Sequence, residues 1–285
     1  MRFDCPKLMK QSTRKSALLT LTVIFITFLK GYSIGNETQV GARDISMGNA
    51  SVALSSPFSV FHNVAALAPI GGISVAIDYR QPYLIEGFSQ KALALVVPTP
   101  TATFAIGIQQ QGIENYQESR FGLAMAKKFG ENFSAGLQFN YFMIGFPEQG
   151  RNRGTFLIDF GILVKTSGNL KLGLHVFNPA GASIESLNLK SKLPLRVTAG
   201  IALNPADRLL LTSALEYRTE SPMNIGLGIE YQLSDCLFLR CGVSGKPIRH
   251  SAGLGYRYKA FRIDFAIVHL QSLGYTPSIS LTLNI

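Results

Sequence analysis

Several segments of the chain alternate between apolar and polar residues, and their charged side chains recur at the polar positions. In an extended strand these side chains would lie together on one face. Arginine beside a carboxylate forms a bidentate ion pair, and a row of such groups can also line a path for a polar substrate. We favour a structural network of ion pairs, because Glu216 and Glu230 fall in successive segments. We expect Arg208 and Arg240 to lie near these two carboxylates. The set expected to face a common interior comprises Asp159, Arg196, Arg208, Glu216, Glu230, Arg240, Arg257, Arg262 and Asp264.

Signatures of catalysis and of metal binding are missing from the sequence. The four histidines stand at positions 62, 175, 250 and 269, and none has an H-E-x-x-H or comparable ligand spacing. No G-x-S-x-G motif or phosphate-binding loop occurs, and Gly253 and Gly255 lie inside an alternating segment. We therefore expect no enzymatic activity, no cofactor and no metal site. A lipase-like or protease-like barrel is the enzymatic alternative that the sequence leaves open.

The elements that position these residues are predicted to be β-strands. Between Asn224 and Leu233, isoleucine, leucine and tyrosine occupy every odd position, whereas asparagine, glycine, glutamate and glutamine occupy the even ones. Such period-two alternation places the two sets on opposite faces of a strand. About fourteen segments of this kind are predicted: 72–79, 90–97, 101–110, 119–129, 132–142, 153–165, 169–178, 193–203, 207–217, 223–233, 236–244, 251–258, 260–270 and 278–285.

The composition and the connectors favour a membrane barrel over a soluble β-sandwich. Of the 285 residues, 47% are hydrophobic and 15% are charged, yet no apolar run after residue 30 approaches the roughly 20 residues of a helical span. Strands cross a bilayer only in a closed barrel. Tight connectors such as 130–131 alternate with longer ones such as 111–118 and 143–152, as in bacterial outer-membrane barrels. An even strand number then places both termini at the periplasmic rim.

The N-terminus predicts export. A basic stretch precedes the apolar run from Ala17 to Leu29, which is the pattern of a secretory signal peptide in residues 1–33. A retained anchor helix is the alternative. Residues 1–33 hold six of the 27 basic and one of the 17 acidic residues, so the remainder carries 21 basic and 16 acidic ones. No basic cluster with interleaved aromatic residues occurs, so we expect no nucleic-acid partner.

The segment between the signal and the first strand, residues 34–71, is predicted to be a hatch inside the barrel, which itself takes up residues 72–285. Residues 55–57 (Ser-Ser-Pro) followed by Phe58 to Leu67 predict a short helix with serine caps and proline in its first turn. The apolar residues of this helix would be exposed to water in a loose periplasmic arm. We therefore favour a plug in the barrel mouth over such an arm.

Residues 41–68, GARDISMGNASVALSSPFSVFHNVAALA, resemble the N-terminal motif of the PorV/PorQ-like proteins of the FadL-like outer-membrane superfamily. Segments such as LPLRVTAGIAL, MNIGLGIEYQL and SAGLGYRYKAFRIDFAIV are also similar to that family. The resemblance implies a fourteen-stranded barrel whose hatch places the corner Asn63, Val64 and Ala65 in the lumen. Val64 stands where the motif has proline, and Ala66 where it has glycine.

The resemblance implies two kinds of function. Some members of the superfamily take up hydrophobic compounds such as fatty acids through a hatch-gated path, and others serve type IX secretion at the cell surface. We favour a passive outer-membrane transporter for small hydrophobic or amphipathic molecules, surrounded by outer-membrane lipid. A non-transporting barrel that binds secretion-system proteins is the alternative. A narrow hydrophilic porin ranks third, because a plugged lumen argues against an open channel.

Overall fold

The computed structural model describes residues 40–147, 150–186, 189–219 and 221–285. The expected signal peptide and the first residues of the expected hatch segment, up to residue 39, lie outside these ranges. No helix within the described ranges is long and apolar enough to span a membrane.

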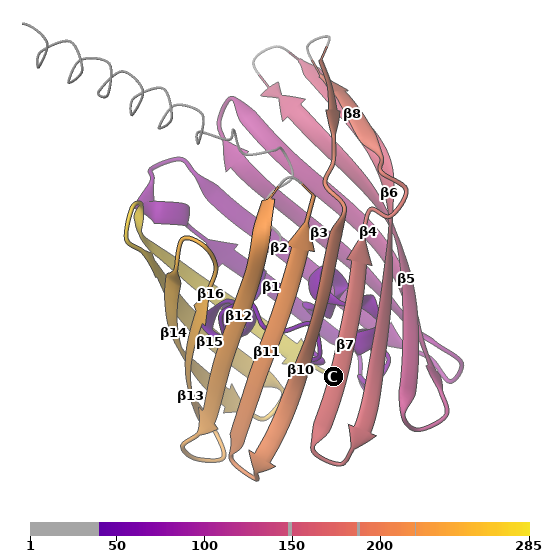
Figure 1. Cartoon of the computed structure of the whole chain (residues 1–285), viewed down its shortest axis with the longest axis vertical. Helices are drawn as coiled ribbons and strands as arrows, with labels where there is room; N and C mark the ends of the chain where they lie inside the picture. Colours follow the sequence, from indigo (N-terminus) through magenta and orange to yellow (C-terminus); the bar gives the residue numbers. More distant parts are fainter. Residues whose placement is uncertain (1–39, 148–149, 187–188, 220) are drawn as a thin grey trace, which may run out of the picture. The chain divides into compact units, whose positions relative to one another are not determined.

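Fourteen antiparallel strands form a closed barrel (Figure 1). The strands are β1 (Ser74–Arg80), β2 (Ser89–Pro98), β3 (Thr103–Ile113), β4 (Tyr116–Phe129), β5 (Phe133–Phe146), β6 (Arg151–Ser167), β7 (Leu170–Phe177), β10 (Arg196–Ala206), β11 (Leu209–Arg218), β12 (Ser221–Gln232), β13 (Leu237–Ser244), β14 (Arg249–Tyr258), β15 (Phe261–Leu270) and β16 (Gly274–Asn284). Each pairs with its neighbours in order, and β1 closes the barrel against β16, with Ser74 opposite Asn284 and Arg80 opposite Ser278. The predicted fourteen-stranded fold is therefore confirmed, since each predicted segment overlaps one barrel strand.

The predicted contrast between short and long connectors is only partly present. We call the end of the barrel where β16 ends the C-terminal rim, and the opposite end the hairpin rim. At the hairpin rim only the connections 81–88 and 178–195 are long, and β3 and β4 are separated by just residues 114–115. The prediction of a loop over 111–118 is wrong, because Gly112 and Gln117 still pair across the two strands. Backbone pairing continues there although the side chains no longer alternate in hydropathy.

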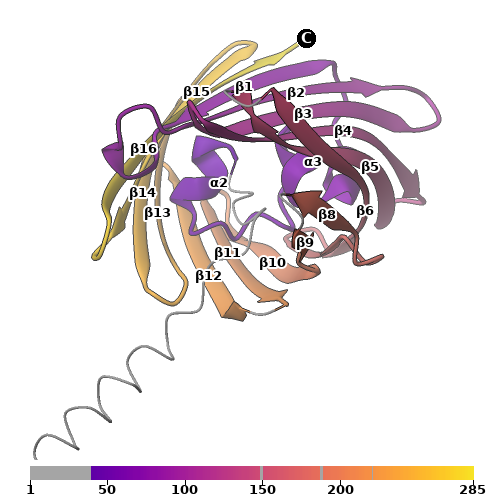
Figure 2. The ribbon, with the colours of Figure 1, turned by 90° about the horizontal axis from the view of Figure 1, so that it is seen from above.

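The connection between β7 and β10 holds an unpredicted hairpin, β8 (Ser183–Ser186) and β9 (Leu189–Lys192), which forms its own two-stranded sheet. Seen along the barrel, this hairpin lies on the inner side of β6 (Figure 2). Ile184 and Leu193 are buried there. The hairpin therefore covers part of the lumen at the hairpin rim.

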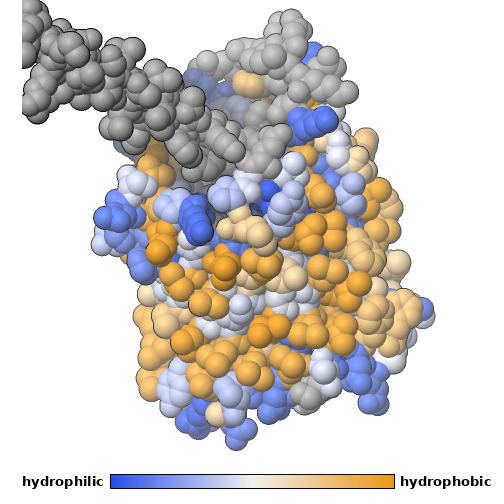
Figure 3. Space-filling view, viewed as in Figure 1, coloured by the Kyte–Doolittle hydropathy of each residue, from blue (hydrophilic) through white to orange (hydrophobic). Residues whose placement is uncertain are grey.

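The alternation of each strand separates an apolar outer face from a polar inner face. On β12, Leu227, Ile229 and Tyr231 are all exposed, whereas Glu230 between them is buried. A band of hydrophobic residues covers the middle of the barrel face in Figure 3, with hydrophilic residues concentrated toward its ends. Exposed apolar residues in such a continuous belt are rare on a soluble monomer.

The hatch consists of α2 (Ala42–Ser46), α3 (Ser59–His62) and the 3-10 helix η1 (Val64–Leu67), which lie inside the barrel (Figure 2). A further 3-10 helix, η2 (Pro82–Leu84), lies between β1 and β2. The prediction of one helix over 58–67 is wrong, because Asn63 is extended, with φ −159° and ψ 103°. The expected serine cap is absent as well: the N-cap residue is Phe58, and no side chain caps α3.

The hatch lies directly against a set of glycines on the inner wall, which we call the glycine girdle. The girdle comprises Gly107, Gly136, Gly161, Gly173, Gly200, Gly226, Gly228, Gly242 and Gly253. A β-carbon built on Gly136 would lie 2.2 Å from Val64 Cγ1, and one built on Gly226 would lie 2.3 Å from the carbonyl oxygen of Gly48. A side chain at these wall positions would collide with the hatch, and at six of the nine the close atoms include atoms of the hatch backbone.

Candidate functional site

The candidate site is the barrel lumen around the hatch. None of residues 40–68 is exposed. Val60, Phe61, Val64 and Leu67 form one apolar cluster with alanines on the inner faces of β1 to β4. This burial means that a molecule crossing the lumen at this level must displace the hatch or pass through a gap beside it.

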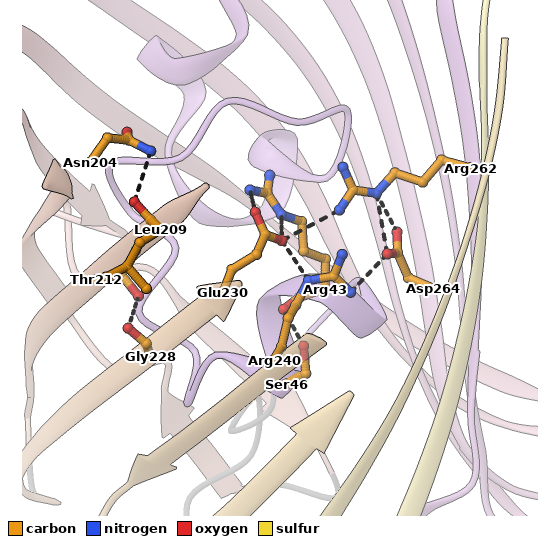
Figure 4. Close-up of polar contacts among 10 residues, drawn as sticks. All are labelled: Arg43, Ser46, Asn204, Leu209, Thr212, Gly228, Glu230, Arg240, Arg262 and Asp264. Atoms are coloured by element: carbon orange, nitrogen blue, oxygen red, sulfur yellow. Dashed lines mark hydrogen bonds and ion pairs between the residues drawn. The ribbon is translucent and has the colours of Figure 1, made fainter. Parts of the chain in front are cut away.

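An ion-pair network ties the hatch to the wall (Figure 4). Arg43 of α2 donates to Glu230 through Nε (2.9 Å) and Nη2 (2.6 Å), which is a bidentate pair. Glu230 also accepts from Arg240 and, at 3.5 Å, from Arg262. Asp264 forms ion pairs of 2.9 Å with both Arg240 and Arg262. We call these five residues the latch network. Arg43 is its hatch residue, and the other four belong to strands of the barrel wall.

The structure assembles four of the nine predicted interior residues, Glu230, Arg240, Arg262 and Asp264, in the latch network. Arg257 lies nearer the C-terminal rim, where its guanidinium is 5.2 Å from the ring of Phe238 and donates to the carbonyl of Asp235. Arg43 was missed by sequence analysis. Its position in the GAR motif was visible, but its partner lies 187 residues away.

Arg208 does not pair with Glu216, which corrects the expectation that the two lie near each other. Arg208 is exposed in the turn between β10 and β11, with its guanidinium 3.9 Å from Asp235. Glu216 lies further along β11 and pairs with Arg218 (3.4 Å) and Arg196 (3.9 Å). The extended strand between positions 208 and 216 separates the two side chains along the barrel wall.

The remaining predicted residues, Asp159 of β6 and Arg196 of β10, lie in a second cluster, since both are paired with Phe177 of β7 between them. Arg120 is central to it: its guanidinium lies 5.3 Å from the ring of Phe61 and 5.7 Å from the ring of Phe177. Arg196 also faces Phe177, at 4.8 Å. Among the described residues, no hydrogen-bond partner reaches any of the three side-chain nitrogens of Arg120. A buried guanidinium between two aromatic rings has the chemistry to bind an acceptor group of an amphipathic molecule.

The hatch corner Asn63, Val64 and Ala65 lies in the lumen. The Asn63 amide nitrogen donates to the carbonyls of Val52 (2.6 Å) and Ile162 (3.0 Å), and its amide oxygen accepts from Ala65 N (3.1 Å). One side chain therefore joins two parts of the hatch to each other and to β6. Because Asn63 is fully buried, each of these hydrogen bonds replaces one that water would otherwise supply.

Two titratable groups are buried inside the hatch itself. His62 Nε2 lies 2.7 Å from the carbonyl oxygen of Val40 and 3.7 Å from Asp44 Oδ2. Burial raises the pKa of Asp44 to about 7, although the nearby charge of Arg43 opposes this shift. Burial also lowers the pKa of His62 to about 4. The packed hatch therefore favours a neutral histidine and carries a carboxyl group that titrates near neutral pH.

A cavity of about 280 Å³ opens between the hatch and the C-terminal rim. Its lining combines hatch residues with the inner faces of β7 and β10 to β13. Among the described residues, no three or more histidine, cysteine or acidic side chains are grouped as a metal site would require.

Neither a protein-family model nor a curated protein sequence matches the chain. Several solved structures have a similar fold. A monoaromatic hydrocarbon channel, CymD, superposes with a TM-score of 0.67 at 13% identity, covering 88% of this chain and 98% of its own. The toluene transporter TbuX of Ralstonia pickettii gives a TM-score of 0.63 at 14% identity, covering 86% and 98%. A FadL homologue of Pseudomonas aeruginosa gives 0.59 at 14% identity, covering 85% and 97%. The chain has the fold of the FadL-like barrels.

Proposed function

We propose that this chain is a non-enzymatic outer-membrane channel for the passive transport of small hydrophobic or amphipathic molecules. The observation that carries the proposal is a closed barrel with an apolar outer face whose lumen is filled by its own N-terminal hatch. The belt of apolar residues on the outer face is the kind of surface that a membrane barrel exposes to lipid. A filled lumen suits a selective path rather than an open aqueous pore. Both termini of the mature chain are then periplasmic.

The fold supports this proposal. CymD is described as a monoaromatic hydrocarbon channel and TbuX as a toluene transporter. The same fold here carries the Arg120 guanidinium between Phe61 and Phe177. An apolar molecule with one acceptor group could therefore be held beside the hatch by stacking and by a charge-assisted hydrogen bond.

A reversible lock on the hatch tests the proposal. Val52 of the hatch and Ala214 on the inner face of β11 pack in one buried apolar cluster, so cysteines at Val52 and Ala214 are chosen as the disulfide pair. The pair is introduced into a background whose native cysteines are serine. Cells are then assayed for uptake of N-phenylnaphthylamine, an uncharged hydrophobic probe. We expect oxidation to abolish the barrel-dependent uptake and a reductant to restore it.

The single variants Val52→Cys and Ala214→Cys serve as controls, because each changes the packing without being able to form the bond. Full uptake in the completely crosslinked double variant would show that passage needs no hatch movement. Equal uptake in cells with and without the barrel would reject the transport function itself.

The close seating of the hatch on the glycine girdle favours one second candidate, a barrel that does not transport. In this case the chain would be the PorV/PorQ-like component of a secretion or surface-attachment system, and its rims would bind protein partners. Affinity purification from gently solubilised outer membranes, with mass spectrometry of lipids and proteins, separates the two. A stoichiometric secretion or surface protein would support the second candidate, and co-purifying hydrophobic molecules alone would support the channel.

A further inference from the structure

A further cavity, of about 220 Å³, lies at the hairpin rim, where β2 and β4 begin and β3 ends. Lys91 of β2, Gln110 of β3 and Gln117 of β4 line it. Lys91 and Gln110 share the outward parity of Leu93 and Ile106, which are exposed on the same strands. The cavity therefore belongs to the outer face of the wall and not to the lumen that the hatch fills.

The strand register places this cavity directly beside the apolar belt of the outer face. Lys91 lies opposite Gln110 on the neighbouring strand. Two residues further toward the C-terminal rim on the same face, Leu93 lies opposite Ile108. The outer face therefore changes from polar to apolar between two adjacent rows, which are about 7 Å apart along the strand. A lipid whose acyl chains cover the belt would place its headgroup at the level of the cavity.

The lining combines one positive charge with neutral hydrogen-bonding groups. Its one carboxylate, Glu114, lies in the turn after β3, four positions beyond Gln110 and so roughly 13 Å from it along an extended chain. Glu114 is thus poorly placed to neutralise Lys91, which lies opposite Gln110. Gln110 Nε2 donates to Gln117 Oε1 at 2.9 Å. The amide oxygen of Gln110 and the amide nitrogen of Gln117 take no part in this bond and can accept from and donate to a ligand.

We infer that this cavity binds the phosphorylated sugar headgroup of a glycolipid whose acyl chains cover the apolar belt. Lys91 donates a charge-assisted hydrogen bond to the phosphate. Gln110 and Gln117 bind the sugar hydroxyls, which both donate and accept. The inference rests on the outer-membrane location of the proposed function, in which the hairpin rim faces the cell surface, and it goes beyond transport. The lipid is a bound partner of the outer wall and not a transported molecule.

Native mass spectrometry of the barrel, purified in an uncharged detergent, counts the lipids bound to each chain. Three probes separate the parts of the headgroup: monophosphoryl lipid A carries sugar and phosphate, phosphatidic acid carries phosphate alone, and diglucosyl diacylglycerol carries sugar alone. Each is titrated into the wild type, Lys91→Gln and Lys127→Gln, whose folds are verified by heat-modifiable gel mobility. Lys127 is the matched control, because it is an exposed lysine of outward parity on β4 that does not line the cavity.

We expect the first monophosphoryl lipid A to bind about tenfold more tightly than either other lipid, and Lys91→Gln to remove this advantage, as for one charge-assisted hydrogen bond. Lys127→Gln should keep it. Equal binding of phosphatidic acid would overturn the assignment to a sugar headgroup. An unchanged affinity in Lys91→Gln, or an equal loss in Lys127→Gln, would overturn the site, since the lipid would then respond at most to net charge. Displacement of the lipid by an equal concentration of inorganic phosphate would also overturn it.

The transport function and this site can fail separately. Uptake of N-phenylnaphthylamine reports passage through the lumen, whereas Lys91 lies on the outer face of the wall. We therefore expect Lys91→Gln to leave that uptake unchanged. Loss of uptake in Lys91→Gln would contradict the placement of the site outside the transport path.

Discussion

Replacing Arg43 by alanine is expected to loosen the hatch and leave the barrel wall intact. Arg43 and Glu230 are joined by two hydrogen bonds of 2.9 and 2.6 Å, and their side chains are only 17% and 9% exposed. Hydrogen bonds to charged groups contribute about 1.5–3 kcal/mol each. Glu230 keeps Arg240 and Arg262 as partners, so no buried carboxylate is left unpaired. The two hydrogen bonds together would contribute about 3–6 kcal/mol, but the alanine also removes the cost of burying the Arg43 charge. The expected net cost is therefore about 2 kcal/mol, below the roughly 3–5 kcal/mol of leaving one partner of a buried pair uncompensated.

Native-state hydrogen exchange measures this cost directly, because it reports local opening free energies. The probes are hatch amides such as Ile45 N, which donates to Gly41 O at 3.0 Å, and Gly48 N, which donates to Ser251 Oγ at 3.2 Å. A loss of about 2 kcal/mol lowers their protection about 30-fold. Amides in the middle of the wall strands should keep theirs.

Arg208→Ala is the matched control. Its ion pair with Asp235 spans 3.9 Å between side chains that are 56% and 96% exposed, so its removal should leave hatch exchange unchanged. Unchanged hatch protection in Arg43→Ala would refute the reasoning and would mean that contacts with the glycine girdle alone hold the hatch. Equal loss of protection in hatch and wall would refute it in another way, since the latch network would then stabilise the whole barrel.

Three further predictions concern the packing and protonation of the hatch. Gly226→Ala places a β-carbon 2.3 Å from the hatch backbone and should lower the free energy of local hatch opening by about 1–3 kcal/mol. Gly168→Ala, whose β-carbon would meet open space, should have no effect. Asn63→Ala removes three hydrogen bonds and should sensitise cells with normal barrel levels to bulky antibiotics; unchanged sensitivity would contradict it. In the packed hatch the pKa of Asp44 is raised from 3.8 to about 7, and the pKa of His62 is lowered from 6.5 to about 4. Asp44 therefore destabilises the packed hatch as the pH rises from 4 to 7. His62 destabilises it as the pH falls from 6.5 to 4. The two slopes oppose each other in the wild type, and Asp44→Asn should therefore uncover a rise in hatch protection between pH 5 and 6.5, measured by the same exchange after correction for the intrinsic rate.

The strands and their two faces follow from local sequence. Alternation along residues 224–233 assigns Leu227 outward and Glu230 inward without knowledge of any other strand, because each residue turns by half a revolution. The same local pattern predicts fourteen strands, and the barrel contains fourteen. Strand ends were predicted less well, since pairing at Gly112 and Gln117 continues beyond the alternating part.

Local sequence also indicates that the residues 41–68 differ from the wall and carry buried apolar side chains. It places Glu230, Arg240, Arg262 and Asp264 on inner faces. It cannot show that Arg43 completes their network, because Arg43 meets Glu230 across 187 residues of chain. It likewise cannot show that Arg120 stacks between Phe61 and Phe177.

Only the tertiary structure decided how the hatch and the wall meet. The hatch touches many strands at once, so its contacts depend on barrel closure, on the register of each strand pair and on the tilt that these impose. The glycines of the inner wall illustrate the difference. In the sequence they are small residues in alternating strands, whereas in the barrel they are the inner-wall positions that lie directly against the hatch. Local alternation encodes which face a residue occupies, but closure of the sheet determines what lies opposite it.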